Sequence, residues 1–284
     1  MSTALDRPGL DRPTLLPRRA LALRALPTPT LAALLLVVTA APALAQSQGI
    51  VSLPPVGPGE SRLLIGGAAL AQPSYAGSSQ HRYRVLPYLD YARRDGFYAS
   101  VTNGLGYSFI QGPALQAGLR LIPQFGRDEN DSPALRGMGD IGTGLEASAY
   151  WTMALTRQWT VGAQVRGGSR GAEFDAGVRR DFMLGPATRL SATTFLTAAN
   201  RKSQQTFFGV DALQAARSGY AVYEPGAGAR NLQFSLTANH FFAGRWIAIG
   251  GVGAGRLLGG AADSPLVREK TQVGGFVAIG YQVF

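Results

Sequence analysis

The segment from Asn231 to Asn239 reads NLQFSLTAN and alternates apolar and polar side chains without interruption. Because consecutive side chains of a strand point to opposite faces, this period of two predicts a β-strand with one apolar and one polar wall. The same alternation returns in most of the chain after residue 60. Soluble β-sandwiches and membrane-spanning β-barrels both use such strands, so the pattern predicts an all-β fold and leaves these two architectures open.

The first 45 residues follow the layout of a secretory signal peptide. Arginines precede an apolar run from Leu31 to Ala41, and Ala43-Leu44-Ala45 supplies the small residues of a cleavage site. This run is shorter than the roughly 20 residues that a membrane-spanning helix needs, which favours cleavage over an uncleaved anchor. We therefore predict a signal peptide over residues 1–45, a flexible Pro/Gly-rich segment over 46–59 and one domain over 60–284.

The composition excludes several classes of function. The chain has no cysteine, so it has no disulfide scaffold, no thiolate nucleophile and no zinc site built on cysteine. Its net charge is +10, but the arginines are scattered between apolar positions and form no stripe. Nucleic-acid binding needs such a stripe, so we expect no nucleic-acid partner.

The lengths of the connections separate the two β architectures. Twelve alternating segments lie at 63–69, 83–91, 97–101, 105–110, 115–121, 145–153, 159–166, 174–182, 190–198, 231–239, 246–257 and 273–284. Short turns at 93–96, 111–113, 156–158, 185–186 and 243–244 are interspersed with long connections at 72–80, 127–139, 201–227 and 259–270. Even numbers of strands separate the long connections, as in outer-membrane barrels with short periplasmic turns and long outer loops. This predicts an antiparallel up-and-down transmembrane β-barrel of twelve strands, or of ten if residues 97–110 form no wall.

The two faces of these strands also differ in the way a barrel requires. The polar face carries charges of both signs that could fill and bridge a lumen, among them Glu146, Arg166, Asp175 and Arg179. The apolar face carries Trp151, Trp159 and Trp246 near strand ends, as in an aromatic girdle at the membrane interface. In the last segment strict alternation places Gln282 on the face of the terminal Phe284, so either a bulge intervenes or this strand presents its residues unusually.

Several motifs of the chain resemble the MipA/OmpV family of outer-membrane proteins. They are Gly126–Asp131 (GRDEND), Leu135–Ile141 (LRGMGDI), Phe207–Val210 (FFGV), Ser218-Gly219, Tyr223–Gly228 (YEPGAG) and Arg256–Pro265 (RLLGGAADSP). They keep the order of the family and span most of residues 104–284. One departure is Asn200, which stands where the family often has Asp.

The resemblance implies an outer-membrane barrel, embedded among membrane lipid and lipopolysaccharide, whose namesake is described as a scaffold. That scaffold brings a murein-degrading lytic transglycosylase together with a murein-synthesising penicillin-binding protein. Other members are linked to envelope permeability or adhesion. We therefore predict a non-enzymatic outer-membrane scaffold without cofactors, with a channel or a permeability or adhesion protein as the alternative.

No catalytic, cofactor-binding or metal-ligating residues are predicted. A lipid-modifying barrel enzyme needs a nucleophile beside a base, and the only histidines, His81 and His240, have no serine motif near them. The acidic loop residues Asp128, Glu129, Asp131 and Asp140 match no EF-hand spacing. We expect instead that Arg127 pairs with Asp128 and Asp140 and orders this loop across the barrel mouth.

Overall fold

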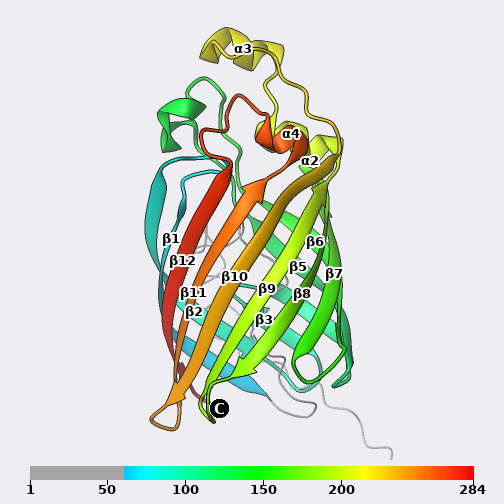
Figure 1. Cartoon of the computed structure of the whole chain (residues 1–284), viewed down its shortest axis with the longest axis vertical. Helices are drawn as coiled ribbons and strands as arrows, with labels where there is room; N and C mark the ends of the chain where they lie inside the picture. Colours follow the sequence, from blue (N-terminus) through cyan, green and yellow to red (C-terminus); the bar gives the residue numbers. More distant parts are fainter. Residues whose placement is uncertain (1–60) are drawn as a thin grey trace, which may run out of the picture.

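Twelve antiparallel strands close into one barrel in a computed structural model that describes residues 61–284. Each strand pairs with its neighbours in sequence, and β1 pairs with β12 to close the wall (Figure 1). The prediction of twelve strands is confirmed, and the alternative of ten is wrong because the segment 97–111 contributes two wall strands. The predicted signal peptide and the segment 46–59 lie outside the described residues.

The strands differ in length, and β3 is much the shortest. The strands are β1 (Arg62–Pro73), β2 (His81–Ala92), β3 (Phe97–Ser100), β4 (Gly104–Gln111), β5 (Leu115–Gln124), β6 (Gly144–Ala154), β7 (Trp159–Gly168), β8 (Gly171–Met183), β9 (Thr188–Ala199), β10 (Gly228–Phe242), β11 (Trp246–Leu257) and β12 (Thr271–Gln282). The helices are α2 (Arg201–Phe208), α3 (Ala212–Ser218) and α4 (Gly259–Ala262), with short 3-10 turns η2 (Glu129–Asp131) and η3 (Pro133–Leu135). None of the helices within residues 61–284 has the length and apolar character needed to cross a bilayer.

The alternation of the sequence separates the outside of the barrel from its lumen. In β10, Leu232 and Phe234 are each 46% exposed on the outer wall, whereas Asn239 on the other face is buried. Arg180 is the one charge on the apolar face of β8, and its guanidinium lies over the rings of Trp159 and Phe182. The predicted lipid-facing and lumen-facing sides are therefore confirmed for these strands.

The two ends of the barrel carry different connections. The long loops and all three helices gather at one end, while the short turns and the C-terminus lie at the other (Figure 1). Trp151, Trp159 and Trp246 are partly exposed on the outer wall, each towards the short-turn end of its strand. Short turns mark the periplasmic end of outer-membrane barrels, so the three tryptophans belong to the periplasmic part of the girdle.

One sector of the lumen is apolar, which the sequence pattern did not predict. Leu64, Tyr88, Ile247 and Ile249 are buried together inside β1, β2 and β11, and Phe276 packs against them. These strands carry apolar side chains on both faces, as strands covered on both sides do.

The pairing of β12 resolves the expectation for the end of the chain. Its registers with β1 and β11 run without a shift, so no bulge intervenes. The even-numbered residues of β12, such as Phe276 and Ala278, point into the apolar sector. Gln282 has that parity and is the last residue of the strand, and Phe284 lies just beyond it, 52% exposed. The strand therefore presents its residues unusually because its lumen face is apolar.

Candidate functional site

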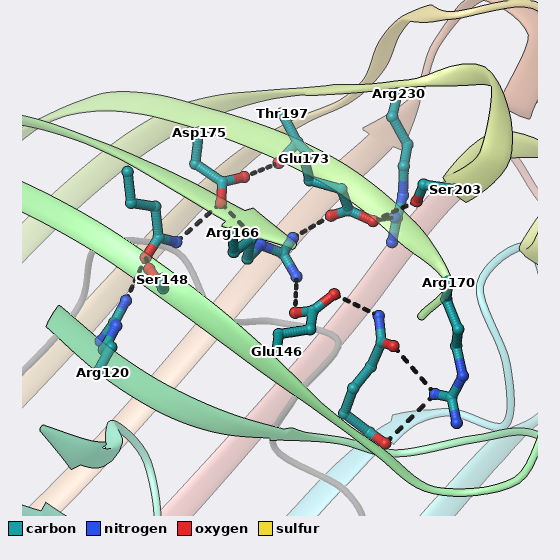
Figure 2. A network of polar contacts seen from close by, with 12 residues as sticks. Arg120, Glu146, Ser148, Arg166, Arg170, Glu173, Asp175, Thr197, Ser203 and Arg230 are labelled. Carbon is teal, nitrogen blue, oxygen red and sulfur yellow. Dashed lines mark hydrogen bonds and ion pairs between the residues drawn. The ribbon is translucent and has the colours of Figure 1, made fainter. Parts of the chain in front are cut away.

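The centre of the polar half of the lumen is Arg166, which points inward from β7. Its Nη1 lies 3.2 Å from Oε2 of Glu146, its Nε lies 3.0 Å from Oδ2 of Asp175, and Nη2 pairs with Glu173. These three carboxylates come from β6 and β8, on either side of β7. Figure 2 shows the guanidinium held between them. One cation thus ties three adjacent strands together inside the barrel.

Neutral and charged side chains complete this network on its outer edge. Asp175 accepts hydrogen bonds from Gln164 Nε2 at 2.8 Å and from the hydroxyl of Thr197. Glu146 accepts one from Gln124 Nε2 at 2.6 Å. The other oxygen of Glu173 pairs with Arg230 and accepts a hydrogen bond from Ser203. Because desolvating each charge costs several kcal/mol, buried ions need this degree of pairing.

Two local features of the chain bring the ends of the network into reach. The pairing of β9 with β10 has a bulge between Ala229 and Asn231, and the extra residue is Arg230, whose side chain joins the lumen network. Helix α2 packs directly against Gly171. A Cβ atom added to Gly171 would come within 2.4 Å of the backbone nitrogen of Ser203 in α2. Only glycine leaves room for this helix to cap the network.

The four long loops are tied to one another and form a lid over the lumen. Tyr75 in the first loop donates to the carbonyl of Leu266 in the last, at 2.9 Å. Gln214 of α3 donates to the carbonyl of Met138 at 2.8 Å, and Ser264 donates to the carbonyl of Phe208 at 2.6 Å. Burial raises the pKa of the Tyr75 phenol above its ordinary value. The lid is therefore a packed layer with its own buried core.

The acidic loop residues order this lid, but not in the predicted way. Arg127 donates to the carbonyl of Phe207 at 3.1 Å, so the predicted pairing of Arg127 with Asp128 and Asp140 is wrong. Asp128 caps η2, and Asp140 accepts from the backbone N–H of Glu129 at 2.8 Å. Within residues 61–284 no three acidic, histidine or cysteine side chains come together as a metal site would need.

The two histidines lie at opposite ends of the barrel. His81 opens β2 at the long-loop end, and its Nε2 lies 3.1 Å from the carbonyl of Val273. His240 lies near the short-turn end of β10, where Nδ1 is 2.8 Å from the hydroxyl of Thr188 and the ring stacks on Phe242. The structure therefore brings neither histidine to a buried nucleophile.

A cavity of about 240 Å³ remains in the lumen between the polar network and the apolar sector. One side consists of Asn231, Gln233, Ser235 and Thr237 of β10, and the other of Ala68, Leu70, Phe276 and Ala278. Glycines at inward positions of β11 leave this space unfilled. The alternation of the sequence did not predict the cavity, although the inward run Gly251, Gly253 and Gly255 is visible in it.

A closed antiparallel barrel with an apolar outer wall, a charged lumen and loops sorted by length is an integral outer-membrane β-barrel protein. Within that class, the chain belongs to the MipA family, because the model of the family "MltA-interacting protein MipA" matches residues 65–283. The predicted family and outer-membrane location are thereby confirmed. No sequence among the curated proteins matches the chain.

Solved outer-membrane barrels resemble the chain only distantly. The KdgM porin is 10% identical with a TM-score of 0.40, and the match covers 77% of this chain and 98% of the porin. A FadL homologue from Pseudomonas aeruginosa is 9% identical with a TM-score of 0.41, covering 80% of this chain and 92% of that one. Likenesses this weak carry no information on substrate or partner.

Proposed function

We propose that the protein is a non-enzymatic scaffold of the outer membrane that holds a lytic transglycosylase close to a penicillin-binding protein. The observation that carries the proposal is the occupied lumen, in which Arg166 joins three carboxylates beneath a packed lid. Such an interior favours a rigid body over an open passage. The description of the family as MltA-interacting supports a murein hydrolase as one partner.

The periplasmic turns offer a surface for such partners. Arg94, Arg157 and Arg245 are exposed there, and Arg93 is partly exposed beside Asp95, its ion-pair partner. This basic rim, defined as these four arginines, complements an acidic surface on a periplasmic protein and would steer its association. Murein enzymes work on that side of the membrane, so the rim has the location that a scaffold requires.

The test is photo-crosslinking in intact cells. A photoreactive amino acid at Arg157 should capture a lytic transglycosylase or a penicillin-binding protein, and the same amino acid at the lid residue Val222 should capture neither. Charge reversal by Arg94→Glu and Arg245→Glu should weaken the crosslink. Failure to recover any murein hydrolase or synthase at Arg157 would refute the scaffold.

The alternative function is a channel, and the lumen cavity is the observation that favours it. Purified protein in planar bilayers distinguishes the two, because a steady ion current favours a channel and an electrically silent barrel favours the scaffold.

A lipid-modifying enzyme is the third candidate. Unchanged lipid A and phospholipid profiles in a strain without the gene would remove it.

We also propose that the precursor is cleaved after Ala45, as the A-x-A pattern of residues 43–45 predicts. The measurement is the mass of the protein isolated from outer membranes, which should correspond to a chain that starts at Gln46. A chain that retains residues 1–45 would contradict this proposal.

A further inference from the structure

The wall of the barrel is incomplete between β2 and β5 in the half nearer the lid. β3 pairs with β2 only from Asp90 to Ala92, and the last backbone bond runs from the N–H of Val101 to the carbonyl of Leu89. β4 pairs with β5 no further than Leu121. Beyond these points, no strand among residues 61–284 pairs with residues 81–88 of β2 or 122–124 of β5 on the sides that face each other.

A proline lies on each rim of this gap. The carbonyl of Leu89 points towards β3, so in β2 the backbone groups of Pro87, two residues away, point the same way, into the gap. In β5 the carbonyl of Ala114 bonds to β6, so the odd-numbered Pro123 faces the β4 side, beyond the end of β4. Proline has no N–H to donate and occurs in sheets at unpaired edges. The sequence thus prevents strand pairing from closing the gap on either side.

The exposure of the outer side chains agrees with a gap. Val85 is 83% and Tyr83 is 79% exposed, more than any other large apolar side chain among the described residues. Outward apolar residues elsewhere on the wall, such as Leu232 at 46%, are shielded by strands on both sides. Tyr83 and Val85 have a strand on one side only.

The lumen cavity reaches the elements that border the lower end of this gap. Its lining includes Tyr88 of β2, Thr102 and Asn103 of the turn between β3 and β4, and Arg120 of β5, which are the elements that border the gap. The side chain of Arg120 holds the tip of the turn, because Nη1 donates to Oδ1 of Asn103 at 3.2 Å. The turn at the lower end of the gap and Arg120 therefore form part of the cavity wall.

The charge of the cavity is positive. Arg120 and Arg230 are the only charged residues among its described lining, and Arg230 is neutralised by Glu173. Arg120 donates to the amides of Asn103 and Gln164 and lies over the ring of Tyr150, and no carboxylate within residues 61–284 forms a salt bridge with it. Arg120 is partly buried, and its Nε has no hydrogen-bond partner within residues 61–284, so it can donate a charge-assisted hydrogen bond to an anion in the cavity.

We propose that this cavity is a binding site for small carboxylates with an apolar body, which enter sideways from the membrane through the gap between β2 and β5. The apolar body would lie against Leu70 and Phe276, and the carboxylate would bind Arg120. A cavity of about 150 Å³ holds a benzene molecule, so one of 240 Å³ accommodates a ring with a short carboxylate chain. This site goes beyond the scaffold function and does not depend on it.

Fluorine NMR on the protein in lipid nanodiscs tests the binding site with two matched probes, para-fluorophenylacetate and the neutral para-fluorophenylacetamide. Wild type should bind the carboxylate at least about tenfold more tightly, because the bond to Arg120 is charge-assisted. Arg120→Gln should abolish this preference and Arg120→Lys should retain part of it. Equal binding of the two probes by wild type, or an unchanged preference in Arg120→Gln, would overturn the site.

A variant that fills the cavity gives a second readout with its own control. At Gly255 an added Cβ would have its nearest neighbour at 3.6 Å, so Gly255→Leu should fold and block binding of both probes. Gly226 is a lid glycine with open space around it, and Gly226→Leu should leave binding unchanged. Full binding by a folded Gly255→Leu variant would place the ligand elsewhere and overturn the proposal.

Thiol labelling tests the sideways entrance, and the absence of native cysteine makes single-cysteine variants unambiguous. In proteoliposomes, Thr102→Cys should react with the membrane-soluble N-phenylmaleimide and not with a permanently charged methanethiosulfonate. Val222→Cys in the lid, at an exposed site, should react with both reagents. Equal reaction of Thr102→Cys with the charged reagent would show that the cavity opens to water and refute entry from the membrane.

Discussion

Replacement of Arg166 by glutamine measures how far the lumen network stabilises the barrel. Arg166 is 12% exposed and pairs with three carboxylates, each no more than 5% exposed. Without it, Glu173 keeps Arg230 and Asp175 keeps Thr197, but Glu146 keeps only the neutral amide of Gln124. Breaking a buried ion pair from one side costs about 3–5 kcal/mol. We expect the free energy of unfolding of Arg166→Gln to fall by that amount.

The assay is equilibrium unfolding in urea from lipid vesicles, followed by the fluorescence of the three tryptophans. The control is Arg201→Gln, which removes an ion pair of similar geometry, at 3.2 Å from Glu224, on side chains 70% and 64% exposed. Exposed pairs contribute only about 0–1 kcal/mol, so this variant should remain close to wild type.

Restoring the wild-type net charge of the network gives a further check on the physical cause. Glu146→Gln added to Arg166→Gln should recover at least about 1 kcal/mol of the unfolding free energy, because it removes an uncompensated buried charge. The reasoning is wrong if Arg166→Gln and Arg201→Gln have the same small effect. It is also wrong if the double variant is less stable than Arg166→Gln by the full cost of a second lost interaction.

Three further predictions concern separate parts of the barrel. Tyr75→Phe removes the hydrogen bond to Leu266 and should lower stability by about 1 kcal/mol and speed tryptic cleavage of the lid on intact cells; unchanged cleavage would mean that this bond does not hold the lid. Gln204→Leu should be neutral or stabilising in the urea assay, because its amide is buried without a hydrogen-bond partner in the described chain, and a loss above about 1 kcal/mol would contradict this. Pro87→Val should change the unfolding free energy by less than about 0.5 kcal/mol, whereas Leu236→Pro, which removes a ladder hydrogen bond in a strand paired on both sides, should cost about 1–3 kcal/mol; a large effect of Pro87→Val would argue against an unpaired edge.

The wall strands were predictable because their signal is local. Alternation at residues 231–239 fixes which side chains share a face, and it needs no knowledge of the neighbouring strands. The sorting of long and short connections adds strand order, since an up-and-down barrel pairs each strand with its sequence neighbours. Even the uncertain segment 97–110 formed the two predicted strands.

The sequence predicted which charged residues face the lumen, but not how they pair with one another. Glu146, Arg166 and Asp175 were expected in the lumen, but their common centre depends on the register between β6, β7 and β8. Arg230 was missed because a bulge turns it inward, and Ser203 because its loop forms a helix above Glu173. The wrong pairing expected for Arg127 has a similar cause, since its partner, Phe207, lies 80 residues away.

The sequence by itself determined the all-β barrel and the two faces of its wall, because backbone geometry imposes a period of two on every strand, and it narrowed the strand number to twelve or ten. The sequence also contains Pro87 and Pro123, which keep the gap between β2 and β5 unpaired. Neither proline alone shows that it faces an unpaired edge. Only the tertiary structure decided that β1, β11 and β12 turn apolar side chains into the lumen, and that a cavity with Arg120 on its wall remains there. The physical reason is that closure of the barrel brings together side chains from strands distant in sequence, and only their packing decides which charges are paired.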